Sequence, residues 1–261
     1  MEFIDTHCHI HFPDYELEPD EVIENARRDG VTKLLCVGCT LPDSKMATQF
    51  ADRHKNIWAT IGLHPHEGAV YVHDHLALQE FRNLATKPKV VAIGETGLDF
   101  HYMHSSKEDQ EKLLRFQLDL AAEHKLPLIF HVREAFADFW RIFDSYEGLN
   151  GVVHSFTAGQ QELDEALSRG LYIGLNGIIT FAKDKHFLDV VKNIPLQKLL
   201  LETDAPFLTP VPFRGKICEP KHVRVTAEFL ADLRGESLDQ LAAATTHNAE
   251  ELFKLSHEGL K

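Results

Sequence analysis

Short apolar runs that favour β-strands alternate with longer segments of helical periodicity along all 261 residues of the chain. In the first of the longer segments, Val22, Ile23 and Ala26 recur at helical spacing, and later segments repeat the pattern. We expect eight strands, at residues 3–6, 33–37, 58–63, 90–94, 128–130, 151–153, 171–174 and 199–201. This regular alternation favours the α/β class, in which helices cover a parallel sheet.

Several of the expected strands are continuous apolar runs, as in parallel sheets that are covered on both faces. Eight strand–helix units in about 250 residues fit a (β/α)8 barrel, the TIM-barrel architecture. A doubly wound open sheet is the alternative, but no G-x-G-x-x-G turn follows the first strand. No linker or change of composition divides the chain, so we expect a single domain over residues 1–261, with a long loop at 206–220.

Ionisable side chains gather where the expected strands end, which in a (β/α)8 barrel is the rim that carries the active site. His7 and His9 are two residues apart and therefore face the same side of a strand, while Cys8 faces the other side. Each histidine alone is as readily explained as a hydrogen-bonded structural residue. Six residues of metal-binding types on five strand ends nevertheless favour a metal site. They are His7, His9, Glu95, His131, His154 and Asp204.

Imidazole and carboxylate ligands together suit Zn²⁺, Mn²⁺, Fe²⁺ or Co²⁺, whereas Ca²⁺ prefers oxygen ligands. Four imidazoles and two carboxylates suffice for two ions about 3.5–4 Å apart that share one carboxylate, an arrangement common in the hydrolysis of phosphate esters and amides. A single ion is the alternative. Metal-activated water needs no nucleophilic side chain, and Ser155 lacks the G-x-S-x-G context of a serine hydrolase.

The chain is strongly acidic, with 27 Lys and Arg against 40 Asp and Glu and a formal net charge of −13. This charge opposes capture of long duplex nucleic acid, so any phosphate-bearing substrate needs cations placed close to it. No basic, apolar leader and no apolar run of about 18 residues is present, so we expect a cytoplasmic protein with no membrane partner. The cysteines are expected to be free thiols, and the C-x-x-C spacing of Cys36 and Cys39 lacks the context of a redox or zinc motif.

Seven short motifs occur in order along the chain. They are Asp5-Thr-His7-Cys-His9, Gly62-Leu-His64-Pro65-His66, Ala92-Ile-Gly94-Glu95-Thr-Gly97-Leu98-Asp99, His131-Val-Arg133, His154-Ser-Phe156-Thr, Leu201-Glu202-Thr203-Asp204-Ala205-Pro206 and Arg214-Gly215-Lys216. Together with the closing Thr245-Thr246-His247-Asn248, they resemble the motifs of TatD-family metal-dependent deoxyribonucleases. The resemblance covers nearly the full chain.

This resemblance implies a (β/α)8 barrel of the amidohydrolase-like superfamily that hydrolyses DNA phosphodiester bonds, commonly from the 3′ end of single strands. It implies two divalent ions per chain, with Mg²⁺, Mn²⁺ and Zn²⁺ as candidates. One ion would be held by His7, His9 and Asp204, the other by His131 and His154, and Glu95 would bridge them. The resemblance also assigns catalytic roles to Glu95, Asp204 and His64. Asp204 would steer the attacking water, and His64 would contact the substrate or assist proton transfer.

Cations and aromatic rings near the strand ends are candidates for substrate contact. We expect Arg133, Arg214 and Lys216 to bind phosphate oxygens, which would offset the acidic surface locally. Six phenylalanines follow strand ends, and we expect two of them, Phe156 and Phe207, to stack on unpaired bases. The predicted partner is single-stranded DNA or a frayed 3′ end, bound by a monomer.

The chain departs from the family pattern at the rim, not at the ligands. His11 stands where aspartate is frequent, Ser155 where cysteine is frequent, and Ile217 and Cys218 precede Glu219-Pro220. Two alternative functions remain. The first is an amidohydrolase or a D-aminoacyl-tRNA deacylase on the same barrel, although Glu95 replaces the lysine whose carbamate bridges the metals of cyclic-amide enzymes. The second, an inactive interaction module, would have no reason to keep six costly convergent polar groups.

Overall fold

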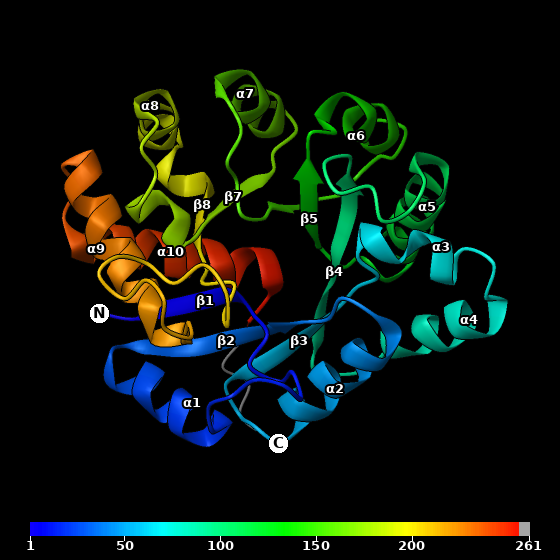
Figure 1. Ribbon diagram of the computed structural model, residues 1–261, viewed down its shortest axis with the longest axis horizontal. Coiled ribbons are helices and arrows are strands. Elements are labelled where there is room, and N and C mark those ends of the chain that lie inside the picture. Colours follow the sequence, from blue (N-terminus) through cyan, green and yellow to red (C-terminus); the bar gives the residue numbers. More distant parts are fainter. Residues whose placement is uncertain (256–261) are drawn as a thin grey trace.

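The computed structural model describes residues 1–255, in which eight parallel strands form one sheet in the order β1 to β8. Helices surround the strands on the outside (Figure 1). The strands are β1 (Phe3–Cys8), β2 (Val31–Val37), β3 (Ile57–Ile61), β4 (Val90–Asp99), β5 (Leu128–Arg133), β6 (Gly151–Val153), β7 (Tyr172–Leu175) and β8 (Leu199–Leu201). The predicted (β/α)8 barrel is confirmed.

The helices follow the strands in alternation, with additional short 3₁₀ turns in the connections. The α-helices are α1 (Pro19–Arg28), α2 (Leu41–Asp52), α3 (Gly68–Tyr71), α4 (His75–Leu84), α5 (Lys107–His124), α6 (Phe136–Phe143), α7 (Gln160–Ser168), α8 (Lys185–Asn193), α9 (Val223–Arg234) and α10 (Leu238–Phe253). The 3₁₀ turns are η1 (Pro65–Glu67), η2 (Gly177–Thr180), η3 (Leu196–Lys198) and η4 (Pro220–His222). None of the helices within residues 1–255 is both long and apolar enough to cross a membrane.

The seam between β8 and β1 closes at the carboxyl end of the strands. The backbone N–H of Asp204 donates to the carbonyl of His7 at 2.8 Å, and that of His9 donates to the carbonyl of Ala205 at 2.7 Å. Below these bonds, the buried carboxylate of Asp5 accepts from the backbone N–H and the hydroxyl of Thr203. The closure therefore fixes His7, His9 and Asp204 relative to one another.

The apolar residues form two separate clusters. One fills the interior of the barrel, and the other lies between the strands and the outer helices. In the interior, inward-facing residues such as Leu35, Ile129 and Leu200 pack against Leu252 and Phe253 of α10. This helix runs across the middle of the molecule (Figure 1, red). The polar rim is therefore supported by a packed apolar core, as in other (β/α)8 barrels.

The observed strand ends differ from the predicted ones where the site begins. β4 continues to Asp99 because the register with β5 shifts after Ile93, and pairing resumes from Thr96 opposite Phe130. Glu95 lies in this irregularity. β3 ends at Ile61, earlier than predicted, and a Cβ at the following Gly62 would collide with the backbone of Glu95. Glycine at this position lets the irregular part of β4 approach β3 closely.

Candidate metal centre

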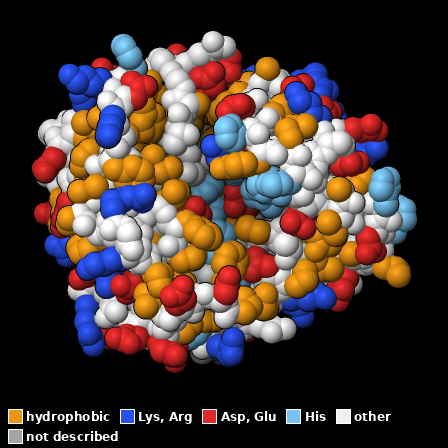
Figure 2. Space-filling model, viewed as in Figure 1, with side chains coloured by type: hydrophobic (Ala, Val, Ile, Leu, Met, Phe, Trp, Pro, Cys, Tyr) orange, Lys and Arg blue, Asp and Glu red, His pale blue; other side chains and the backbone are white. Residues whose placement is uncertain are grey.

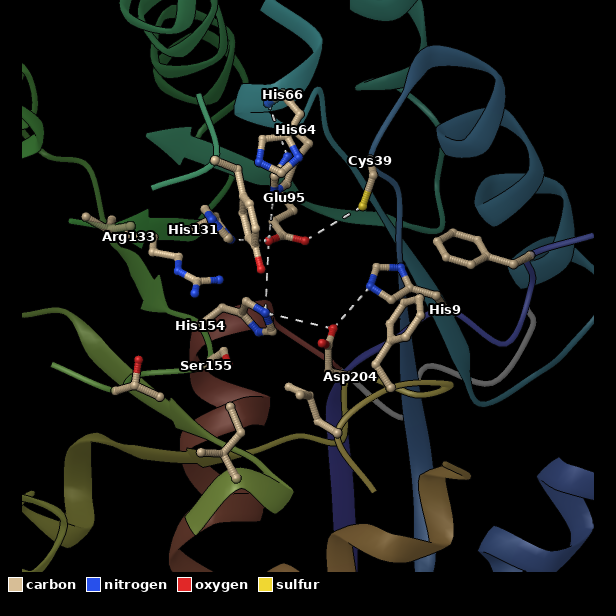
Figure 3. A pocket seen from close by; sticks show the side chains of 17 residues that line it. His9, Cys39, His64, His66, Glu95, His131, Arg133, His154, Ser155 and Asp204 are labelled. Carbon is tan, nitrogen blue, oxygen red and sulfur yellow. Dashed lines mark hydrogen bonds and ion pairs between the residues drawn. The ribbon is translucent and has the colours of Figure 1, made fainter. Parts of the chain in front are cut away.

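A pocket of about 800 Å³ opens at the carboxyl end of the barrel strands. Figure 2 shows a hollow near the middle of this face, with histidine and acidic side chains inside it. Figure 3 shows the lining, which includes five of the six predicted metal ligands, namely His9, Glu95, His131, His154 and Asp204. The sixth, His7, is fully buried directly beneath them.

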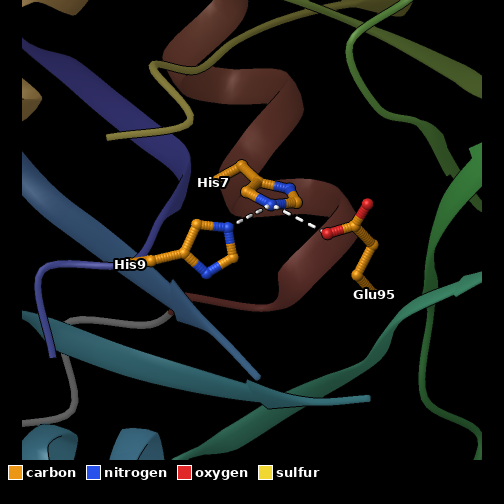
Figure 4. A group of neighbouring side chains, drawn as sticks. All are labelled: His7, His9 and Glu95. Carbon is orange, nitrogen blue, oxygen red and sulfur yellow. Dashed lines mark hydrogen bonds and ion pairs between the residues drawn. The ribbon is translucent and has the colours of Figure 1, made fainter. Parts of the chain in front are cut away.

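The first group of converging atoms comes from β1, from the residue after it, and from β4 and the turn after β8. His7 Nε2 lies 3.5 Å from both Glu95 Oε2 and Asp204 Oδ1, and His9 Nε2 lies 3.4 Å from Asp204 Oδ1. The two Nε2 atoms are 3.2 Å apart (Figure 4). Four ligand-type atoms therefore face one small space.

The hydrogen bond behind His9 identifies its protonation. His9 Nδ1 lies 2.7 Å from the carbonyl oxygen of Val37, which can only accept, so Nδ1 carries the proton. In the neutral ring, Nε2 then presents a lone pair toward His7 and Asp204. A nitrogen lone pair and a carboxylate oxygen repel each other unless a proton or a cation lies between them. Two imidazole nitrogens and two carboxylate oxygens are a donor set that fits a divalent metal ion.

The second group faces the other oxygen of Glu95. His131 Nδ1 lies 2.9 Å, His64 Nε2 3.6 Å and His154 Nε2 4.0 Å from Glu95 Oε1. The carboxylate thus stands between two clusters of imidazoles, with Oε2 toward His7 and Oε1 toward His131. A carboxylate in this position is suited to bridge two ions.

Contacts with neighbouring imidazoles keep both predicted carboxylate ligands ionised. Burial alone would raise the pKa of Glu95, but the imidazoles of His64, His131 and His7 outweigh it and hold the pKa well below its ordinary value. Asp204 behaves in the same way: burial opposes its charge, and the neighbouring histidines lower its pKa. Both carboxylates are therefore available as anionic ligands at neutral pH.

Two buried carboxylates behind the predicted ligands were not assigned a role from the sequence. Asp99 Oδ2, at the end of β4, lies 2.9 Å from His131 Nε2. Glu202 Oε1 lies 2.9 Å from His154 Nδ1 and accepts the backbone N–H of Ser155 at 2.7 Å. Burial lowers the pKa of His154, but the charge of Glu202 reverses this and raises the pKa to about 10. Both acids belong to the strand-end motifs of the sequence, and this position is the feature from which a role at the site could have been predicted.

Cys39, His66 and Tyr102 also line the pocket, although no site role was predicted for them. The Cys39 thiol lies 3.7 Å from Glu95 Oε2, and all four cysteines are unpaired. His66 Nε2 lies 3.2 Å from Asp99 Oδ2. These three residues come from loops after β2, β3 and β4, where no apolar pattern predicts which side chains turn inward.

The predicted substrate residues divide into two sets. His64, Arg133 and Phe207 line the pocket. Arg214 and Lys216 do not: the guanidinium of Arg214 lies over the Phe181 ring at 4.0 Å and donates to the carbonyl of Thr209. The Lys216 ammonium lies 5.7 Å from the ring centre of Phe213. The loop after β8 thus directs these two cations to neighbouring aromatic rings.

Phe156, which was predicted to contact substrate, does not line the pocket. Its side chain is only 3% exposed and packs edge-on against Phe136 of α6. The reason is local: the backbone N–H of Phe156 donates to the carbonyl of Gly174, which continues the pairing beside β7. The ring consequently enters the layer between the sheet and the outer helices.

Buried imidazoles and ionised carboxylates that meet at the carboxyl end of a parallel barrel define the class of metal-dependent barrel hydrolases. Within that class, the family model described as TatD related DNase matches residues 4–254, and the chain belongs to this family.

Relatives of known name agree with this assignment. The chain is 38% identical to an uncharacterized metal-dependent hydrolase, YabD, of Bacillus subtilis, over 97% of this chain and 99% of that protein. It is 39% identical to the 3′-5′ ssDNA/RNA exonuclease TatD of Citrobacter rodentium, over 91% and 92%. The crystal structure of the TatD homolog YJJV of Escherichia coli superposes with a TM-score of 0.88 at 32% identity, covering 97% of this chain and 98% of that one.

Proposed function

We propose that this protein is a two-metal phosphodiesterase that removes nucleotides from the 3′ ends of single-stranded DNA. The observation that carries the proposal is the placement of Glu95 between two clusters of imidazoles, one facing each carboxylate oxygen. His7, His9 and Asp204 would hold one ion, and His131 and His154 the other, with Glu95 shared. Mg²⁺, Mn²⁺ and Zn²⁺ are the candidate ions, and the site draws every predicted ligand from one chain, in accord with a monomer.

Bound divalent ions would lower the pKa of a water molecule and neutralise charge on the phosphate. Asp204, ionised and at the pocket floor, is placed to accept the proton of the attacking water. Its backbone has a φ of 64°, a left-handed conformation that aspartate tolerates better than most residues. This conformation turns the chain directly after β8 and directs the carboxylate toward His7 and His9.

His64 is suited to donate a hydrogen bond to a phosphate oxygen. The backbone N–H of His66 donates to His64 Nδ1 at 3.2 Å, so the ring proton is on Nε2, which faces the pocket. Burial lowers the pKa of His64 to about 4, so the ring is neutral at pH 7. The Nε2–H group can then bind the substrate, but it does not act as a base while it carries this proton.

The substrate class rests on charge as well as on the relatives. The protein carries a net charge of −13, and among the described residues Arg133 is the only Lys or Arg that lines the pocket. A short stretch of backbone at a strand end needs few cations, whereas a long duplex needs many. The name of the Citrobacter relative, a 3′-5′ ssDNA/RNA exonuclease, supports the same substrate class and the same polarity.

The test is digestion of single-stranded DNA labelled at the 3′ or the 5′ end. Protein stripped with EDTA is assayed after separate addition of Mg²⁺, Mn²⁺ or Zn²⁺, with Asp204→Asn as the control and matched RNA as the competing substrate. We expect stepwise shortening from the 3′ end that requires both metal and Asp204. A protein that binds metal but cleaves no oligonucleotide would refute the proposal and would favour amide or aminoacyl-ester substrates.

A further inference from the structure

We propose that Tyr102 and Arg133 form one platform that stacks on the base and holds the phosphate of the nucleotide being removed. This inference rests on the proposed function and adds the group that recognises an unpaired strand end. The platform stands on the β4 and β5 side of the pocket, and Figure 3 places Arg133 beside His131, across the site from His9.

Tyr102 is an exposed ring at the mouth of the pocket. Its exposed fraction is 53%, and of the large exposed apolar or aromatic side chains within residues 1–255 only Tyr102 and Phe207 line the pocket. In the described part of the chain, its hydroxyl makes no hydrogen bond to protein. His101 and His66 meet the ring edge-on, and His104 lies nearly parallel to it with ring centres 5.9 Å apart, yet more than half of the side chain stays exposed. Exposed aromatic rings in a substrate groove are typical stacking surfaces for unpaired bases.

Arg133 lies over this ring with its hydrogen-bonding edge free. The guanidinium carbon is 4.7 Å from the ring centre of Tyr102. Arg133 is exposed, and in residues 1–255 it has neither an ion pair with an acid nor a side-chain hydrogen bond. Stacking through the face of the guanidinium leaves its N–H groups available to phosphate oxygens. Because Arg133 follows His131 by two residues at the end of β5, that charge stands next to the metal centre.

A single carboxylate ties the platform to a predicted metal ligand. Asp99 Oδ1 accepts the backbone N–H of His101 at 3.0 Å and that of Tyr102 at 2.9 Å. The other oxygen of Asp99 lies 2.9 Å from His131 Nε2. Gln110 bonds both the N–H and the C=O of Asp99, so this buried acid cannot shift freely. The backbone from which the Tyr102 ring projects is therefore held relative to His131.

The opposite wall carries rings of its own. Phe207, 55% exposed, follows Asp204 by three residues, and its N–H donates to the carbonyl of Asp204 at 2.8 Å. Phe12, also in the lining, stacks on His9 with ring centres 4.6 Å apart. A base that enters between these walls must leave its own stack and its pairing partner, which selects a frayed or single-stranded end.

The experiment compares single-stranded oligonucleotides that differ only at the 3′-terminal nucleotide, which is either normal or abasic. Binding is measured with Asp204→Asn protein loaded with Mn²⁺, and cleavage with the otherwise unaltered enzyme. We expect the Asp204→Asn protein to bind the normal oligonucleotide roughly tenfold more tightly than the abasic one, the range that one stacked base contributes. A 2-aminopurine at the terminal position should be quenched on binding.

Tyr102→Leu should lose that roughly tenfold preference, while Tyr102→Phe should keep it because the hydroxyl has no hydrogen-bond partner within residues 1–255. The abasic oligonucleotide should bind the Leu and Phe variants equally. If both variants bind the normal oligonucleotide equally well, the platform proposal is overturned. The same holds if Tyr102→Leu loses affinity equally for the normal and the abasic oligonucleotide. Cleavage separates the two proposals: an enzyme that cleaves DNA but is indifferent to Tyr102→Leu refutes the platform alone. Tyr102-dependent binding without any cleavage refutes the phosphodiesterase alone.

Discussion

An oxygen atom lies behind each predicted imidazole ligand on β5, after β6 and after β1. Asp99 stands behind His131, Glu202 behind His154, and the carbonyl of Val37 behind His9. Such partners select which ring nitrogen carries the proton and fix the direction of the lone pair. The rim therefore depends on buried residues that touch neither metal nor substrate.

Asp99→Asn tests whether the carboxylate oxygen behind His131 supports metal binding. The amide keeps an oxygen for the N–H groups of His101 and Tyr102 but removes the charge that faces His131. We expect metal affinity, measured by calorimetric titration, to fall about 10- to 100-fold with little change in thermal stability. Glu134→Gln, which removes the charge from the exposed 2.7 Å pair with His101, is the matched control and should bind metal normally. Unchanged affinity in Asp99→Asn would show that His131 needs no such partner.

His222 links stability to pH at a distance from the metal centre. It is buried, its Nδ1 accepts the backbone N–H of Glu219 at 3.0 Å, and burial lowers its pKa to about 4. The unfolded chain takes up this proton near pH 6.5 and the folded one does not, so the stabilising contribution is complete above pH 6.5 and is lost toward pH 4. Across this window we expect a loss of about 1–2 kcal/mol from this residue.

Chemical denaturation of His222→Asn at several pH values measures that contribution. The difference in unfolding free energy between wild type and variant should shrink as the pH falls from 7 to about 4.5, because only the wild type loses this term. His247→Asn, at a side chain that is 76% exposed, is the matched control and should give a nearly constant difference. A pH-independent difference for His222→Asn would mean that the imidazole is not held neutral.

At the scale of elements, the close approach of β3 and β4 positions the carboxylate of Glu95. The register of β4 shifts between Ile93 and Thr96, and Glu95 turns into the pocket from that interval. The backbone N–H of Glu95 then donates to the carbonyl of Gly38 at 3.0 Å, beyond β2. The irregularity in β4 places a side chain that a regular strand would direct elsewhere.

Gly62→Ala should disturb this element specifically. The added methyl group would collide with the backbone of Gly94 and Glu95, which cannot move aside as a flexible side chain could. We expect a loss of about 1–3 kcal/mol in unfolding free energy and weaker metal binding in the protein that folds. Gly159→Ala, where only the carboxylate of Glu162 is near, should cost less than about 1 kcal/mol and leave metal binding intact. Equal effects of the two substitutions would contradict this account of Glu95.

At the scale of the whole molecule, one cation serves a pocket in an acidic protein. Arg214 and Lys216 are turned toward aromatic rings. Among the described residues, Arg133 is therefore the one basic side chain that lines the pocket. Binding that neutralises about one phosphate by a side chain releases few counterions. The affinity for single strands should therefore depend only weakly on salt.

Titration of a short single-stranded oligonucleotide into Mn²⁺-loaded Asp204→Asn protein measures this dependence. Between 50 and 200 mM salt we expect the Kd to rise about threefold, which corresponds to a slope near −0.7 in log K against log salt. Arg133→Gln should flatten the slope, and Arg214→Gln should leave it unchanged. A steep slope that Arg214→Gln reduces would place the DNA path over the loop after β8 instead.

The amino-acid sequence alone determined the barrel and the strand-end positions of six residues of metal-binding types. Apolar runs at strand length alternate with helical patterns, and a parallel barrel brings the carboxyl ends of its strands together whatever the details. His7, Glu95 and His154 lie far apart in the chain, yet strand-end placement was sufficient to predict that they meet.

Only the tertiary structure decided which way the neighbouring side chains turn. Phe156 lies in the core because its backbone N–H continues the pairing beside β7. The guanidinium of Arg214 lies over the Phe181 ring and not in the pocket. Asp99 reached His131, and Tyr102 met Arg133, through contacts between loops and strands about thirty residues apart. Orientation after a strand end depends on backbone turns and on partners distant in the chain, and no local periodicity encodes either of them.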